Sequence, residues 1–354
     1  MKLLESTIEK IEAQDTGVRT LAEARLAQLT MPYWALGRLM DLAVDLAGIT
    51  RSLTPPVRRK TIVTMAGDHG VVTAGVSKYP REVTVQMVHN IARGGAGINA
   101  LAGLAGARVV VVDMGVAGDL TDLVRDKKII SRRVAHGTRN MTEGPAMTRK
   151  EAILCVEGGI ETALDLASDT DVFGTGDMGI GNTTPSSAIV SVFSGSPVAE
   201  VTGRGTGIDE EQFLNKIAVI ERAIALNNPD PLDALDVLAK VGGFEIGGIA
   251  GLILGAASVK KPVLVDGFIS TAGALVAANL SPISREYMIA SHRSVEQGHR
   301  IGLNALGKKP LLDLDLRLGE GTGAALSMHL VEAAVRVLTE VATFEEAAVS
   351  RADS

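Results

Sequence analysis

Hydrophobic residues follow two different patterns along the chain. In residues 1–58 apolar positions recur at helical spacing, as at Leu36, Leu39 and Met40. From Lys60 onward, short continuous apolar runs alternate with glycine-rich turns and amphipathic stretches. The apolar runs predict strands at residues 61–65, 109–113, 172–173, 263–265 and 288–290.

Helical periodicity lies between the predicted strands, at residues 83–92, 148–167, 185–192, 210–226, 246–257 and 295–306. Strands that alternate with helices and are apolar throughout indicate a parallel sheet covered on both faces. We therefore expect an α/β fold with a doubly wound parallel sheet. A further amphipathic helix at about 322–341 is expected to return to the N-terminal helices. The predicted division is helices of a smaller domain at 1–58, an α/β catalytic domain at 59–320 and a returning segment at 321–354.

Composition narrows the possible classes of function. The chain has 354 residues, and 21% charged against 46% hydrophobic residues exclude wholesale disorder. A net charge of −6 and only 3% aromatic residues argue against nucleic-acid binding. No apolar run reaches the roughly 18 residues of a membrane span, and residues 1–19 do not resemble a signal peptide. We expect a cytoplasmic protein with neither a nucleic-acid nor a membrane partner, and the single cysteine, Cys155, excludes an intrachain disulfide.

Acidic residues and glycines follow four of the predicted strands. Ligands of open parallel sheets bind beyond the carboxyl ends of the strands, so these turns are expected to line one cleft. The turns are Gly67-Asp68-His69-Gly70, Asp113-Met114-Gly115, residues 174–179 and Asp266-Gly267. His69 is open to a metal-binding, a catalytic or a structural interpretation, of which a structural hydrogen bond is the commonest for a lone histidine.

The segment 174–185, GTGDMGIGNTTP, leads into a helix expected to start at Pro185 with Thr184 as its N-cap. It contains G-x-G-x-x-G, a weak dinucleotide signature, and Glu200 follows at about the distance of a ribose-binding acid. No Lys-Ser/Thr pair follows, so this is not a Walker A loop. The segment is either a phosphate cradle at a helix N-terminus or a plain tight turn.

A second glycine-rich loop at 203–207 is equally open to two interpretations. Arg204 suits a bidentate phosphate contact. The loop also resembles an ordinary helix entry, because Asp209 and Gln212 have the spacing of a capping box.

Glu320 stands between glycines in the segment GEGTG at 319–323. In this position Glu320 is either an acid–base group or part of an ordinary surface turn. The preceding run, 311–318, alternates strictly, and its Asp313 and Asp315 are better interpreted as a solvated strand face than as a metal-binding D-x-D. No HxH, HExxH, CxxC or adjacent Asp-Asp pair is present, so neither a metal nor a cofactor is expected.

Five segments together resemble the nicotinate-nucleotide:dimethylbenzimidazole phosphoribosyltransferase family. They are AGDHGVVTAGVSKYPREVTVQM, GTGDMGIGNTTPSSA, GRGTGID, PVLVDGFISTAGAL and RLGEGTGAAL, and the similarity is collinear from about residue 60 to 340. The resemblance implies a doubly wound sheet with a small helical domain from both chain ends, and a homodimer. It also implies transfer of phosphoribose from nicotinate mononucleotide to 5,6-dimethylbenzimidazole, giving α-ribazole 5′-phosphate and nicotinate for cobalamin biosynthesis.

The resemblance implies roles for individual residues as well. The family's catalytic glutamate falls on Glu320. Asp177 stands where many members have glutamate, so it is expected either to be a second active-site carboxylate or to close a turn. The benzimidazole pocket maps to Ser77, Pro80, Gln86 and Leu318, and the phosphate and ribose contacts map to Gly176, Gly205, Lys216, Ser294 and Arg317.

Two other classes of function stay open. An NAD-dependent oxidoreductase would use the G-x-G-x-x-G and Glu200. A nucleotide-binding regulatory protein without turnover would use the same glycine loops, but it gives no reason for Glu320 to stand between glycines.

Overall fold

The computed structural model describes residues 1–205 and 207–350; residue 206, in the second glycine-rich loop, and residues 351–354, at the end of the predicted C-terminal segment, lie outside it. Six parallel strands form the main sheet in the order β3-β2-β1-β4-β5-β6. This is the strand order of a doubly wound sheet, so the predicted fold class is confirmed. The strands are β1 (Lys60–Gly67), β2 (Ala107–Gly115), β3 (Ile130–Ser131), β4 (Val172–Met178), β5 (Val263–Val265) and β6 (Met288–Ala290).

A second, two-stranded sheet lies beside the main one. It pairs β7 (His292–Ser294) in parallel with β8 (Leu312–Leu316), the strand of the strictly alternating run. Asp313 is exposed and pairs with Arg293 at 2.6 Å, while Asp315 is exposed at a positive φ. Both aspartates belong to a solvated strand face, as the pattern predicts.

The predicted helices are present, with ends that differ by a few residues. Helix α8 begins at Thr183 with Asn182 at its N-cap position, so the expected start at Pro185 with a Thr184 cap is wrong. The longer helices are α1 (Lys2–Ile8), α2 (Thr16–Leu26), α3 (Arg38–Thr50), α4 (Val83–Ala92), α5 (Gly97–Ala105), α7 (Arg149–Leu166), α8 (Thr183–Ser194), α10 (Glu210–Asn227), α11 (Ala234–Val241), α12 (Phe244–Ser258), α13 (Phe268–Leu280), α14 (Gln297–Leu306) and α15 (Thr322–Glu340). Shorter α-helices are α6 (Thr121–Arg125) and α9 (Val198–Val201), and 3₁₀ helices lie at Gly70–Ala74, Ala167–Asp169 and Pro282–Tyr287.

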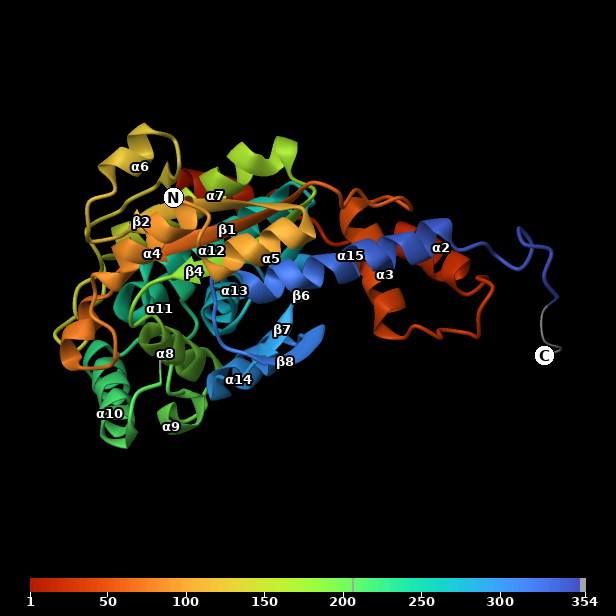
Figure 1. The fold of residues 1–354 in the computed structure, drawn as a ribbon. Coiled ribbons are helices and arrows are strands. Elements are labelled where there is room, and N and C mark those ends of the chain that lie inside the picture. Colours follow the sequence, from red (N-terminus) through yellow and green to blue (C-terminus); the bar gives the residue numbers. More distant parts are fainter. Residues whose placement is uncertain (206, 351–354) are drawn as a thin grey trace.

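Helices cover both faces of the main sheet (Figure 1). Alternate side chains of β1 show the two layers: Ile62 and Ala66 pack with α4, α5 and α15, whereas Val63 and Met65 pack with α7, α12 and α13. Because both faces are buried, every residue of the strand is buried, and its apolar residues are not confined to every second position. The carboxyl ends of the strands are left free for a site.

Helix α15 runs from the sheet to α2 and α3, so an N-terminal and a C-terminal segment pack together there, while the two termini themselves lie at opposite sides of the molecule (Figure 1). Met40, Leu46 and Leu338 are buried together there. Helix α1 instead packs against α7 and α12, and the amino group of Met1 pairs with Glu157 at 2.6 Å. The division of the chain at residues 58 and 320 stays a prediction. In the described part of the chain, no helix is long and apolar enough to cross a membrane.

Candidate active site

A cavity of about 480 Å³ opens beyond the carboxyl ends of β4 and β5. Two surface hollows, of about 600 and 620 Å³, are larger, but neither is lined by Asp177 or Glu320. The smaller cavity brings together most of the residues that the sequence singles out. Those in its wall are Ser77, Asp177, Gly205, Ser294, Arg317, Leu318 and Glu320.

Four other predicted site residues lie outside this wall. Pro80 and Gln86 are exposed, next to the wall residues Tyr79 and Met87. Lys216 is buried behind Thr183, and a Cβ on Gly176 would lie 2.3 Å from the carbonyl oxygen of Glu320. Gly176 therefore allows a close backbone approach and forms no part of the wall.

The expectation that four acid-and-glycine turns line one cleft is wrong for two of them. Asp113 is buried and pairs with Arg133 at 2.7 Å, and Asp68 accepts the N–H of Ala117 at 2.8 Å. His69 is buried in a 2.8 Å hydrogen bond with Glu245, also outside the wall. The tertiary fold uses these residues for internal contacts.

Glu320 is buried at the cavity with its backbone in the left-handed region, at φ +61°. Its Oε2 accepts the N–H of Ile98, in the first turn of α5, at 3.1 Å. Burial raises the pKa of Glu320, and the Ile98 N–H partly opposes this shift. A buried carboxylate with a raised pKa is suited to accept a proton near neutral pH.

Asp177, the last residue but one of β4, lies near Glu320 and combines both features that the sequence leaves open: it closes a turn and it faces the cavity. Its Oδ2 accepts the Asn182 amide at 2.9 Å, which closes the loop, while the residue also lines the cavity. Its Oδ1 has no hydrogen-bond partner among the described residues. Burial, followed by the charge of Asp266, raises the pKa of Asp177 to about 8.

A buried cation lies behind a second part of the cavity wall, where Thr183 and Gly205 line it. Lys216 donates to the hydroxyl of Thr183 at 2.8 Å and to the carbonyl of Gly203 at 3.1 Å. Burial lowers the pKa of Lys216 to about 8, against the opposing charge of Glu296. The exposed Arg317 also reaches the wall. This cation, with the hydroxyl and the glycine loop, is suited to an anion.

Lys216 lies on helix α10, whose first turn is stabilised by a side-chain cap. Asp209 accepts the N–H of Gln212 at 2.8 Å and forms the predicted capping box at the start of α10, which carries Lys216. Arg204, which is open to a phosphate contact in the sequence, pairs with Glu210 and lies over Phe213 at 5.0 Å. It does not line the cavity.

Sequence reasoning misses several residues of the wall. Val83 and Met87 lie one turn apart on α4, and the helical spacing of residues 83–92 is the signal that could have found them. Glu296 and His292 carry no such signal, since their neighbours are distant in the sequence. Burial lowers the pKa of His292 to about 4, so its ring is neutral at neutral pH. The apolar part of the wall consists mainly of Val76, Val83, Met87, Met178, Ile180, Phe268 and Ile269.

The arrangement can bind an anion beside a buried proton acceptor and an apolar wall. Within residues 1–205 and 207–350, no group of three or more His, Cys, Asp and Glu side chains is placed to hold a metal ion. The chemistry that these side chains offer is proton transfer to a carboxylate, with an anionic group held elsewhere in the cavity.

Comparisons with known proteins agree with one another. A family model described as "Phosphoribosyltransferase" matches residues 11–349. The chain is 63% identical to a nicotinate-nucleotide–dimethylbenzimidazole phosphoribosyltransferase of Syntrophotalea carbinolica, over 99% of each chain. It is 56% identical to the enzyme of that name in Geobacter sulfurreducens, over all of both chains. A crystal structure of the protein of that name from Thermus thermophilus is similar with a TM-score of 0.90 and 45% identity, covering 96% of this chain and 100% of that one.

Proposed function

The chain belongs to the nicotinate-nucleotide–dimethylbenzimidazole phosphoribosyltransferase family, and from this premise we propose that it transfers phosphoribose from nicotinate mononucleotide to 5,6-dimethylbenzimidazole or a related base. The products are α-ribazole 5′-phosphate and nicotinate, a step that suits the synthesis of the lower ligand of cobalamin. The relatives give no support to an NAD-dependent oxidoreductase or to a nucleotide-binding protein without turnover.

Glu320 is the general base of this proposal, and its buried position in the cavity is the observation that carries it. One nitrogen of the azole attacks C1′ of the ribose while the bond from C1′ to the pyridinium nitrogen breaks. The electron pair of that bond neutralises the pyridinium, so nicotinate departs without a protonating acid. The proton of the azole N–H passes to Glu320.

The nucleotide's 5′-phosphate is assigned to the part of the cavity around Lys216, Gly205 and Arg317. The Lys216 ammonium contacts two neutral oxygens in a buried setting, and an incoming phosphate dianion would favour its charged form. Ser294 is assigned to the ribose, whereas Gly176, which lies outside the wall, is assigned only to the close approach of the Glu320 backbone. Binding of this remote group orients C1′ toward the azole.

The apolar wall is assigned to the azole, with Ser77 and Leu318 at its border. Asp177 is assigned a secondary role beside Glu320, either in stabilising positive charge on the ribose or in orienting the azole. The placement of Pro80 and Gln86 around the bound base stays a prediction.

The proposal includes a homodimer that works in the cytoplasm. Tyr33, 79% exposed, and Trp34 form an aromatic pair with ring centres 5.5 Å apart on the segment between α2 and α3, and such a pair is suited to contact with a second copy. Size-exclusion chromatography with light scattering measures this state; a monomer at micromolar concentration would contradict it.

The test of the function is release of nicotinate when the protein is mixed with nicotinate mononucleotide and 5,6-dimethylbenzimidazole. We expect nicotinate and α-ribazole 5′-phosphate in equal amounts, with loss of turnover in Glu320→Gln. Glu340→Gln, at the other end of α15, is the matched control because Glu340 is exposed and pairs with Arg336 at 3.8 Å on the same helix. Binding of the mononucleotide without release of nicotinate would contradict the proposal.

A further inference from the structure

The loop that contains the proposed general base has an unusual backbone conformation at Glu320 itself. Gly319, Glu320 and Gly321 are three consecutive residues in the left-handed region, with φ angles of +82°, +61° and +101°. Left-handed backbone is unfavourable for a residue with a Cβ, and it persists only where the surroundings determine it. The two glycines adopt it readily, so Glu320 is the member of the three that needs support.

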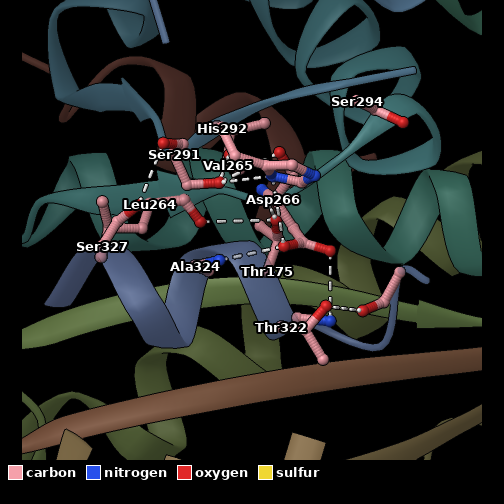
Figure 2. Close-up of polar contacts among 12 residues, drawn as sticks. Thr175, Leu264, Val265, Asp266, Ser291, His292, Ser294, Thr322, Ala324 and Ser327 are labelled. Atoms are coloured by element: carbon pink, nitrogen blue, oxygen red, sulfur yellow. Dashed lines mark hydrogen bonds and ion pairs between the residues drawn. The ribbon is translucent and has the colours of Figure 1, made fainter. Parts of the chain in front are cut away.

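Asp266, at the end of β5, provides one support. Its Oδ2 accepts the N–H of Gly321 at 3.2 Å, and its Oδ1 accepts the N–H of Ala324 at 2.9 Å. Figure 2 shows the carboxylate pointing toward the first turn of α15, where Ala324 and Thr322 lie. Both oxygens are therefore engaged by backbone donors of the loop and of the helix that follows it.

Asp266 is itself held in place by its neighbours (Figure 2). Its N–H donates to the hydroxyl of Thr175 at 3.0 Å, and its carbonyl accepts the hydroxyl of Ser291 at 3.1 Å. The residue is buried and does not line the cavity. A contact with substrate is thus not its role, and it replaces the N-cap side chain that α15 lacks, because Gly321 occupies the N-cap position.

Thr64, in the middle of β1, provides the second support. Its buried hydroxyl donates to the carbonyl oxygen of Glu320 at 2.9 Å. The peptide group between Glu320 and Gly321 is thereby tied to the sheet at both ends, its carbonyl by Thr64 and its N–H by Asp266. The Glu320 side chain makes a third contact through Ile98.

We propose that Asp266 and Thr64 are positioning residues that hold the left-handed backbone of Glu320 and so aim its carboxylate at the substrate. This inference rests on the proposed role of Glu320 as general base. Misplacement of a reacting group by about 1 Å is worth on the order of 10² in rate.

Asp266→Asn is the first variant to test. The asparagine amide keeps the shape, but its NH₂ group cannot accept one of the two backbone N–H groups. We expect kcat to fall by about 10- to 100-fold, with KM for both substrates within about threefold of the wild type. In a Glu320→Gln background, where the base is already absent, the same change should lower kcat by less than about threefold.

Thr64→Val is the second variant and keeps the test decisive if Asp266→Asn does not fold. We expect a fall of about 3- to 10-fold in kcat, again lost in the Glu320→Gln background. Matched controls are Asp113→Asn, a buried aspartate at the end of β2, and Thr61→Val, a buried threonine of β1. Both controls should keep kcat whatever they do to the melting temperature.

The outcomes separate the two proposals. Normal turnover in Glu320→Gln would remove the base itself and the inference with it. Suppose that Glu320→Gln is impaired, but Asp266→Asn or Thr64→Val lowers kcat in the Glu320→Gln background by the same factor as in the wild type. Glu320 then remains the base and the positioning role is overturned. The same holds if neither variant lowers kcat in the wild type. Loss of the effect in the Glu320→Gln background supports the positioning role.

Discussion

The cavity has ionisable groups of opposite charge at its two parts, two carboxyl groups at one and a buried ammonium behind the wall of the other. Around Glu320 and Asp177, burial raises the pKa of each carboxyl group. Around Lys216, burial lowers the pKa of the ammonium. In both parts the protein has made the charged form less favourable than it is in water.

The difference lies in what each charge gains when substrate arrives. In the proposed reaction Glu320 becomes neutral by taking a proton, so its buried setting favours the product of proton transfer. In the same proposal Lys216 stays charged and gains an anionic partner, so its setting favours binding of a phosphate. The proposed role of the first part is on the reacting atoms, and that of the second is to orient them through a remote group.

The largest expected effect comes from removing the proposed proton acceptor, Glu320. Glu320→Gln is nearly isosteric but cannot accept the azole proton, so we expect kcat to fall by about 10²–10⁴-fold with little change in substrate affinity. Steady-state release of nicotinate measures kcat, and calorimetry measures binding of the mononucleotide. Near-normal turnover would remove Glu320 from the mechanism.

The next largest effect is expected from removing the proposed contacts with the 5′-phosphate. We expect unphosphorylated nicotinate riboside to be a poor substrate, and Arg317→Ala to erode the preference for the mononucleotide by about 10- to 100-fold, because hydrogen bonds to charged groups are worth about 1.5–3 kcal/mol. The ratio of kcat/KM for the two substrates measures this preference. Arg300→Ala, which alters the neighbouring hollow, should leave it unchanged. Equal reaction of the riboside in the wild type would contradict the phosphate assignment.

Much of the fold could be predicted because strands such as β1 contain short runs of mostly apolar residues and are followed by glycine-rich turns. Helix α13 (Phe268–Leu280) was not predicted; like α12, which was, it is buried around almost its whole circumference, so amphipathic contrast does not distinguish the two helices. Strand β3 has only two residues, too few for any pattern.

The residues of the candidate site also fall into those that a local sequence pattern reveals and those that it does not. Glu320 could be found because a lone carboxylate between glycines is local information. The pairing of Glu320 with Thr64 joins residues 256 positions apart, and no local pattern records it. Asp113 and Asp266 look alike in sequence, each an acid at a strand end, but only tertiary structure shows that the first pairs with Arg133 and the second accepts a backbone N–H beside Glu320.

A smaller effect tests whether Asp177 acts in the reaction or only closes its loop. An active-site role predicts that Asp177→Asn lowers kcat on the order of tenfold without loss of thermal stability, and that Asp177→Glu keeps part of the turnover. Turnover assays and melting curves of both variants measure this. Normal turnover in both would leave Asp177 with only its hydrogen bond to Asn182.

The smallest effect concerns stability and follows from the raised pKa of Asp177, about 8 against its ordinary value of 3.8. Between these two pH values the unfolded chain has lost this proton while the folded chain keeps it, so stability falls as the pH rises and the loss is complete above pH 8. Asparagine does not titrate, so the melting temperature of Asp177→Asn relative to the wild type should rise by a few °C, as an order of magnitude, from about pH 5 to about pH 8, and then level off. Asn182→Ala is the complementary variant, because loss of the amide that lowers the pKa of Asp177 should extend the fall in stability to higher pH. Parallel melting temperatures of wild type and Asp177→Asn across this range would mean that Asp177 is already ionised in the folded protein, and the cavity would then hold its carboxylates as permanent negative charge.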